Sequence, residues 1–240
     1  MKYLLLVGDG MADWPVPSLN NRTPLECART PNMDRVAARG LLGRVSTVPP
    51  GMQPGSDVAN LSLLGYDPAR YYSGRAPFEA AAMGIPLAGS ETAFRCNLVT
   101  IEDDTMVDYS AGHITTEEAH RIIGDLQRRL NTDSTRFYPG VSYRHLMICR
   151  DFPDGTRCTP PHDITGQPTA SYLPQGDGAD FLLGLMRQAH AILPGCEANG
   201  ERRAAGKRPV TDIWLWGQGR SMSLPTIPQR YGLRGSVISA

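Results

Sequence analysis

The first part of the chain alternates apolar runs with apolar residues at helical spacing. Residues 3–7 form a continuous apolar run of strand length, which is typical of a strand buried on both faces of a parallel sheet. Residues 31–40 start with a proline, carry apolar positions at helical spacing and stop at a glycine, so they predict a helix. Residues 41–48 are again strand-like. Together the three segments predict a β-α-β unit.

The pattern changes near residue 86, where strand-like runs begin to follow one another directly. Residues 93–101 and 105–109 are two such runs, joined by Asp103 and Asp104. A connection this short predicts a hairpin rather than a crossover. A second kind of structure therefore starts here.

Helices and strands of this second part follow in a regular order. Thr115 and Glu118 have the spacing of a capping box and precede an apolar face at helical spacing, which predicts a helix. That apolar face consists of Ala119, Ile122, Ile123, Leu126 and Leu130. Residues 136–139 and 143–149 predict two further strands, and residues 177–193 predict a second amphipathic helix. The order of these elements is that of an α+β insert.

The last part of the chain is expected to leave this insert again. Residues 197–208 are polar and charged, so we expect a solvated loop. Residues 210–216 predict a strand that returns to the first domain. Residues 236–240 start a further apolar run, and the chain stops inside it. We therefore expect the sequence to be a portion of a longer protein.

Composition narrows the classes of partner. Among 240 residues, 24 basic and 24 acidic side chains give no net charge, so neither nucleic acid nor an anionic membrane is an expected partner. No apolar run approaches the roughly 20 residues of a membrane span, and we expect a cytoplasmic protein. The five cysteines are dispersed without a C-x-x-C pair, which argues against a disulfide framework and against a zinc cluster.

Two residues of the first part, Ser56 and Asp9, are candidates for a site that binds an anion and a metal ion. Ser56 opens a predicted helix after a loop rich in proline and glycine, where backbone N–H groups and the helix dipole favour an anion. Asp9 follows the apolar run 3–7, at the end of a strand where ligands gather in α/β sheets. A hydroxyl facing a carboxylate suits a metal-activated nucleophile. The alternatives are an ordinary helix cap for Ser56 and a turn residue for Asp9.

Seven short motifs, spread in order along the whole chain, resemble those of the archaeal-type cofactor-independent phosphoglycerate mutases of the alkaline phosphatase superfamily. The motifs are VGDGM (7–11), GSDVANL (55–61), GYDP (65–68), DYSAGH (108–113), YRH (143–145), PPHD (160–163) and WLWGQGR (214–220).

The resemblance implies interconversion of 3-phosphoglycerate and 2-phosphoglycerate, without a bisphosphoglycerate cofactor and through a phosphoserine. It implies that Ser56 is the nucleophile, and that Ser56 and Asp9 bind two divalent ions, manganese before magnesium, cobalt or zinc. For the glycerate it nominates residues of the insert and one arginine of the strand that follows. These are His113, Arg144, His145, His162, Asp163 and Arg220.

The implied fold is α/β, with an alkaline phosphatase-like parallel-sheet core that is incomplete here and an inserted α+β domain. We expect the core in residues 1–86 and 208–240 and the insert in residues 87–207. In this family the remaining aspartate and histidine metal ligands follow later in the chain, so we expect these 240 residues to have weak or absent mutase activity.

Two other functions stay open. One is a related metal-dependent phosphoryl transfer, such as homoserine kinase-like activity, because fold does not fix substrate. No Walker-type run or kinase motif set supports it. The other is a truncated chain that binds phosphate esters without turnover. A homo-oligomer is left open.

Overall fold

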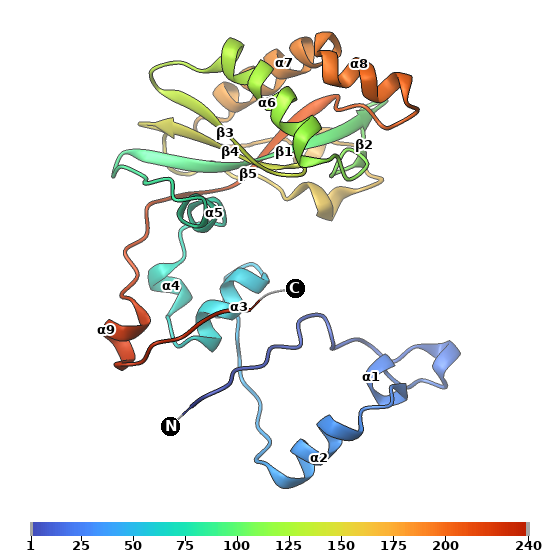
Figure 1. Cartoon of the computed structure of the whole chain (residues 1–240), viewed down its shortest axis with the longest axis vertical. Helices are drawn as coiled ribbons and strands as arrows, with labels where there is room; N and C mark the ends of the chain where they lie inside the picture. The colour runs from blue at the N-terminus through green and yellow to red at the C-terminus, as the bar shows by residue number, and fades with distance from the viewer. Residues whose placement is uncertain (1, 239–240) are drawn as a thin grey trace. The chain divides into compact units, whose positions relative to one another are not determined.

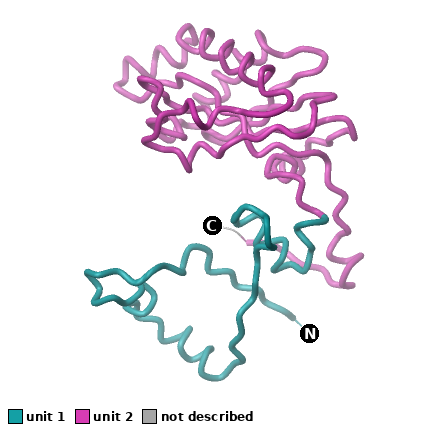
Figure 2. The backbone as a smooth tube through the Cα atoms, turned by 180° about the vertical axis from the view of Figure 1, so that it is seen from behind, with its two compact units in different colours: residues 1–70 teal, residues 71–240 magenta. Residues whose placement is uncertain are grey.

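The computed structural model describes residues 2–238. The chain divides into two compact units, Met1–Arg70 and Tyr71–Ala240 (Figure 2). Each unit is described on its own. In the described residues, no helix has the length and apolar character that crossing a membrane requires.

The first unit consists of short helices and long irregular segments (Figure 1). The predicted helix at 31–40 is confirmed as α2, which has a proline in its first turn and ends before Gly40. The predicted helix at Ser56 is confirmed as α3, with Gly55 rather than Ser56 as its N-cap residue. The helices of this unit are η1 (Pro17–Leu19), α1 (Pro24–Cys27), α2 (Pro31–Arg39), α3 (Ser56–Leu63) and α4 (Pro68–Tyr71), the last reaching the unit boundary.

The predicted β-α-β unit is not formed in the described residues. Residues 3–7 and 41–48 are in no strand, and residues 3–7 and 41–46 are exposed, with Leu4 at 90% and Leu41 at 103%. A strand needs a neighbouring strand to pair its N–H and C=O groups, and neither run has one in the part of the chain that the structure describes. Residues 236–238 are likewise exposed coil, and the rest of that predicted strand lies outside the described residues.

The second unit is built on a five-stranded antiparallel sheet. The strand order is β2-β1-β4-β3, and β5 also pairs with β1. The hairpin predicted across Asp103 and Asp104 is confirmed, and both residues have positive φ, as a tight hairpin turn requires. The strands are β1 (Glu91–Glu102), β2 (Thr105–Asp108), β3 (Thr135–Val141), β4 (Arg144–Arg150) and β5 (Asp212–Arg220). The chain is thus a mixed α/β protein.

Helices cover both faces of this sheet (Figure 1). On one face α6 and α7 bury the main core, which includes Phe94, Leu98, Ile122 and Leu182. On the other face α5 packs a smaller core of alanines and aliphatic residues. Both predicted amphipathic helices are confirmed, and α6 begins with the predicted capping box. The helices of the second unit are α5 (Ala76–Ala82), α6 (Thr116–Leu130), η2 (Pro161–Ile164), η3 (Ala170–Tyr172), α7 (Ala179–Ile192), η4 (Leu193–Gly195), α8 (Glu197–Ala204) and α9 (Ile227–Tyr231).

The segment predicted as a solvated loop at 197–208 contains a helix, α8, and that prediction was wrong. Asn199 and Arg202 are buried, at 0% and 2% exposure. Asn199 exchanges hydrogen bonds with the backbone of Val210, and Arg202 forms an ion pair with Glu118. Buried polar groups are tolerated because these partners satisfy them. Two polar side chains of this segment therefore belong to an internal network, while residues 203–208 are exposed.

The strand predicted at 210–216 is present as β5, but its place differs from the prediction. It pairs with β1 in the sheet of the second unit, so that Leu215 lies opposite Cys96. The apolar side chains of β5 become part of the main core instead of returning to a phosphatase-like core. The predicted boundaries at residues 86 and 208 concern a phosphatase-like domain that the described residues do not assemble, and they stay a prediction.

Candidate functional site

The strand register gathers polar side chains on the sheet face that α5 covers. Residues directly opposite one another on antiparallel strands point to the same face. Arg95 lies opposite Trp216, and Asn97 lies opposite both Arg144 and Trp214. This face therefore carries arginines and tryptophans side by side. We call the group around it the cationic–aromatic cluster: Arg75, Arg95, Arg144, His113, His162, Tyr109, Tyr143 and Trp216.

Trp216 is the platform of the cationic–aromatic cluster. The Arg95 guanidinium lies 4.5 Å from its ring centroid and that of Arg75 lies at 5.7 Å. The His162 ring meets it edge-on at 5.3 Å. Trp216 Nε1 donates a 3.0 Å hydrogen bond to Asn97 Oδ1, which fixes the indole plane. Two guanidinium groups thus lie within cation–π distance of one aromatic ring, whose electrons attract both cations.

Arg95 is a buried cation with only part of its donors satisfied. The residue is 6% exposed, and its guanidinium forms a 3.1 Å ion pair with Glu79 on α5. Burial lowers the pKa of Arg95, Glu79 opposes this, and the nearby Arg75 and Arg144 add to it. Its Nε has no hydrogen-bond partner in the described residues. A buried, charged side chain with a donor that lacks a hydrogen-bond partner favours binding of an anion.

A chain of aromatic contacts links His162 to the remaining members. His162 lies 6.0 Å from Tyr109, Tyr109 lies 5.6 Å from Tyr143, and His113 lies 6.5 Å from Tyr143. The Arg144 guanidinium lies 5.6 Å from the Tyr143 ring. The structure therefore brings together His113, Arg144 and His162, all of which the sequence nominated from separate segments.

Electrostatics set the charge state of His162. Burial lowers its pKa below the ordinary value, and Arg75 and Arg95 lower it further, while Asp163 raises it. Asp163 lies next to the ring, with 3.5 Å between its Oδ1 and Nε2 of His162. At neutral pH this imidazole is uncharged, so it can both donate and accept a hydrogen bond.

The structure does not bring His145 into the cluster. It lies opposite Cys96, which faces the main core, and is only 1% exposed. Its Nδ1 accepts a 2.9 Å hydrogen bond from the N–H of Gly140. Burial lowers the pKa of His145 to about 3, with a smaller contribution from the charge of His120. These contacts are those of a neutral residue packed inside the unit.

Arg220 lies at the far end of β5, in a different setting. Its Nη2 donates a 3.1 Å hydrogen bond to the carbonyl of Phe152 and forms a 3.2 Å ion pair with Asp154. Its Nε is buried without a hydrogen-bond partner among the described residues. With Thr156 and Gln218 it lines a cavity of about 300 Å³.

Sequence reasoning nominated none of Arg75, Arg95 and Trp216 as site residues. A charged residue in the middle of an otherwise apolar strand, as at Arg95, was the available signal. At Arg75 the signal was the preceding Gly74, whose φ is +151°. A Cβ there would lie 1.9 Å from the carbonyl oxygen of Gln218, so this close approach to β5 requires glycine.

Ser56 and Asp9 belong to the first unit. Ser56 is partly buried as the first residue of α3, and Asp9 is exposed beside Gly10, whose φ is positive. Within residues 2–238, no group of three or more histidine, cysteine, aspartate or glutamate side chains is arranged to hold a metal ion. Two oxygen ligands do not fill the coordination of two divalent ions. The described residues alone therefore do not fit a two-metal centre.

An antiparallel sheet that presents arginines, neutral histidine and aromatic rings on one face defines a unit that can bind a small anionic molecule. The comparisons with known proteins identify the family. A family profile described as 2,3-bisphosphoglycerate-independent phosphoglycerate mutase matches residues 37–199. The chain belongs to this family, as its motifs predicted.

Relatives of the same description are about half identical to the chain over the aligned residues. The mutase of Methanosarcina acetivorans is 52% identical across 100% of this chain and 61% of its own length. The mutase of Methanothrix thermoacetophila is 54% identical, again across 100% of this chain and 60% of its own. The chain thus spans about three fifths of the length of these relatives.

Solved structures extend the comparison to the fold. A Pyrococcus horikoshii protein matches 93% of this chain and 53% of its own, with a TM-score of 0.64 and 28% identity. A cofactor-independent phosphoglycerate mutase from Thermoplasma acidophilum matches 92% of this chain and 59% of its own, with a TM-score of 0.55 and 28% identity.

Proposed function

We propose that this chain is the N-terminal portion of an enzyme that interconverts 3-phosphoglycerate and 2-phosphoglycerate without bisphosphoglycerate. The observation that carries the proposal is the cationic–aromatic cluster in a member of this family. A phosphoglycerate has a phosphate, a carboxylate and a hydroxyl. The cluster offers arginines for the two anionic groups and the uncharged His162 for the hydroxyl.

Arg95 is the residue on which binding depends most in this proposal. Its guanidinium is already desolvated and oriented between Glu79 and Trp216. Binding of an anion at its unpaired Nε therefore requires little further ordering of the arginine side chain. Arg75 adds a second guanidinium over the same ring. Neutral histidine beside them can exchange hydrogen bonds with a hydroxyl in either direction.

Ser56 is the proposed nucleophile. Its Oγ would attack phosphorus, the bond from phosphorus to the glycerate oxygen would break, and that oxygen would take a proton. The phosphoserine would then return the phosphoryl group to the other hydroxyl of the glycerate. Its place in the first turn of α3 puts it where N–H groups and the helix dipole favour a phosphate. Divalent ions, manganese first, would supply positive charge, with Asp9 and Ser56 among their ligands.

The other metal ligands are proposed to lie outside these 240 residues, because the described ones do not complete a metal centre. We further propose that the enzyme acts in the cytoplasm on its small-molecule substrate.

Binding of 3-phosphoglycerate by the 240-residue chain tests the cluster directly. Isothermal titration calorimetry should show binding that Arg95→Met weakens by about tenfold or more, since a charge-assisted bond is lost. Arg136→Met, at an exposed position on β3, is the matched control and should leave the affinity unchanged. Equal affinities for the two variants would remove the cluster from the proposal.

A coupled mutase assay with manganese tests the metal part. The 240-residue chain should show weak or no turnover, and normal turnover would mean that its own residues complete the centre. In a chain extended to the length of its relatives, Ser56→Ala should abolish transfer while 3-phosphoglycerate still binds. A variant that kept its rate would show Ser56 to be structural.

A further inference from the structure

The turn that carries His113 has a backbone that is rare outside glycine. Ala111, Gly112 and His113 have φ values of 49°, 68° and 49°, so three consecutive residues adopt the left-handed conformation. This conformation is unfavourable for a residue with a Cβ, and two of the three have one. It persists only where the surrounding structure holds it in place.

The carboxylate of Asp108 binds this turn. Its Oδ1 accepts hydrogen bonds from the N–H and the Oγ of Ser110, at 2.8 and 2.6 Å. Its Oδ2 accepts from the N–H of Gly112 and from the guanidinium of Arg208, both at 3.0 Å. Burial raises the pKa of Asp108, but these hydrogen bonds outweigh it and hold the pKa below its ordinary value. The carboxylate is therefore ionised at neutral pH, and its hydrogen bonds are charge-assisted.

Ser110 connects this carboxylate to His113. The residue is 1% exposed, and its Oγ accepts a 3.2 Å hydrogen bond from the N–H of His113 while donating to Asp108. A hydroxyl has one proton and two lone pairs, so it can do both at once. The carbonyl of Ser110 accepts from the N–H of Ile114, also at 3.2 Å. Ser110 therefore fixes the backbone on both sides of His113.

Arg202 of α8 holds the same turn from a distant part of the chain. It is 2% exposed, and its Nη2 donates a 2.6 Å hydrogen bond to the carbonyl of Ala111. Its Nη1 forms a 2.5 Å ion pair with Glu118 of α6, and its Nε donates to the carbonyl of Arg208 at 3.0 Å. Because a buried guanidinium is costly unless its donors are paired, this arrangement favours one position of the Ala111 carbonyl.

We propose that Ser110 and Arg202 are positioning residues for His113, and that they direct its imidazole into the cationic–aromatic cluster for binding of a phosphoglycerate. The His113 ring is exposed and meets the ring of Tyr143 at 6.5 Å. Backbone conformation limits the rotamers of a side chain, so a fixed turn limits the directions of this ring. The proposal rests on the proposed function, in which His113 belongs to the binding site.

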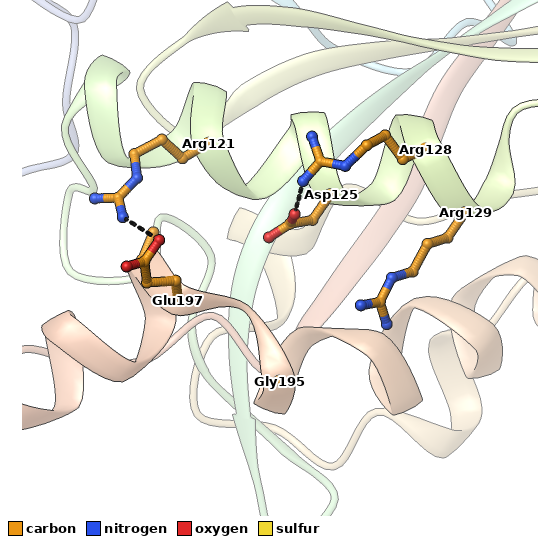
Figure 3. Close-up of a pocket in the computed structure, with 7 residues that line it drawn as sticks. Arg121, Asp125, Arg128, Arg129, Gly195 and Glu197 are labelled. Atoms are coloured by element: carbon orange, nitrogen blue, oxygen red, sulfur yellow. Dashed lines mark hydrogen bonds and ion pairs between the residues drawn. The ribbon is translucent and has the colours of Figure 1, made fainter.

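The same two helices are joined by a second contact that does not reach the turn. Arg121 of α6 forms exposed ion pairs with Glu197 at 3.2 Å (Figure 3) and with Glu201 at 2.6 Å, both on α8. Arg121→Met therefore removes a contact between α6 and α8 without touching Ser110 or Ala111. It is the matched control for Arg202→Met.

Nuclear Overhauser spectra of the 240-residue chain test the orientation of His113 without a ligand. A cross-peak between the rings of His113 and Tyr143 is expected in the unchanged chain and in Arg121→Met. Ser110→Ala and Arg202→Met should weaken it strongly. Ser110→Ala removes a single oxygen and keeps the test open if Arg202→Met does not fold. A cross-peak that is absent from the unchanged chain, or that Ser110→Ala leaves as it is, overturns the proposal.

Calorimetric titration with 3-phosphoglycerate tests the consequence for binding. Ser110→Ala should weaken the affinity about tenfold, and Arg121→Met should leave it unchanged. In a His113→Ala background, Ser110→Ala should weaken it by less than about twofold, because residues that act through one another are not additive. An unchanged affinity for Ser110→Ala, or an equal loss in both backgrounds, contradicts the proposal. If the unchanged chain does not bind 3-phosphoglycerate, the proposed function fails, and the ring contact alone decides whether Ser110 and Arg202 orient His113.

Discussion

Two apolar runs of the same kind differ in this molecule, because one is exposed and the other is buried. In the first unit, residues 3–7 are exposed, from 46% at Val7 to 90% at Leu4. In the second unit, residues 93–99 of β1 are all buried, although they include an arginine and an asparagine. Judged by hydrophobicity alone, residues 3–7 are the better candidate for a core strand.

The two runs differ in burial because they differ in the strands and helices beside them. Strand β1 pairs with β4 along one edge and with β5 along the other, and helices cover both faces. Residues 3–7 have no strand beside them among the residues that the structure describes. The hydrophobicity of a run thus sets how much free energy its burial could contribute to stability. Whether the run is buried depends on the strands and helices that pack against it.

Alanine substitutions in the two runs should give the largest contrast. Phe94 is fully buried and packs edge-on against Phe152 at 4.9 Å, so Phe94→Ala should cost about 3–5 kcal/mol of unfolding free energy. Leu4→Ala should change it by less than about 0.5 kcal/mol. Urea unfolding followed by the emission of the buried Trp214 and Trp216 measures both. A large cost for Leu4→Ala would show that residues 3–7 are buried in solution.

The ion pair beneath the cluster should give the next largest effect. Glu79→Gln leaves the buried Arg95 without its anionic partner. We expect a loss of about 2 kcal/mol, less than for a fully buried pair because the Glu79 side chain is 31% exposed. Asp34→Asn, at an exposed residue of the first unit, should have no resolvable effect. If both variants unfold alike in urea, Arg95 has another source of stabilisation.

The sequence predicted those elements whose signal is local. The capping box at Thr115, the helical spacing of α6 and α7 and the turn at Asp103 need only a few neighbouring residues, and all of them are confirmed. The place of β5 and the burial of Arg202 depend on residues far away in the sequence. No local pattern encodes such partners.

In the candidate site, too, some residues follow from local sequence motifs and others only from the pairing of distant strands. His113, Arg144 and His162 were nominated from motifs, and the structure brings them together. His145 follows Arg144 directly, but in a strand successive side chains point to opposite faces, so only the register shows that it enters the core. At Arg95 the only local signal was a charge inside an apolar strand, and its neighbour Trp216 became known only from the pairing with β5.

Protonation of His145 should make the second unit sensitive to mild acid. All five histidines of the chain lie in that unit. With a pKa of about 3 in the folded state against 6.5 in the unfolded one, the unfolded state binds the proton first as pH falls. Stability should therefore decrease below pH 6.5, by up to about 1.4 kcal/mol per pH unit.

Urea midpoints between pH 6.5 and pH 5 measure this effect without interference from carboxylates, which titrate lower. His145→Gln should flatten the dependence, whereas His120→Gln, at an exposed residue that bonds the carbonyl of Gly140, should retain most of it. An unchanged slope for His145→Gln would assign the acid sensitivity to another group.

The smallest contrast uses a motif that both units contain. Thr23 and Thr115 each cap a helix with the same box, accepting from the N–H of Glu26 at 3.1 Å and of Glu118 at 3.3 Å. Thr115→Ala should cost about 1 kcal/mol, because α6 is packed on the sheet and its first turn must stay formed in the folded unit.

Thr23→Ala removes the same hydrogen bonds from α1, a helix of 4 residues with none buried. Loss of that turn uncovers no core, so the cooperative transition seen by Trp214 and Trp216 should not move. Equal shifts in the urea midpoint for the two variants would mean that the first turn of α1 unfolds together with the sheet. In that case burial in the second unit would depend on residues of the first, and the contrast between the two units would not hold in solution.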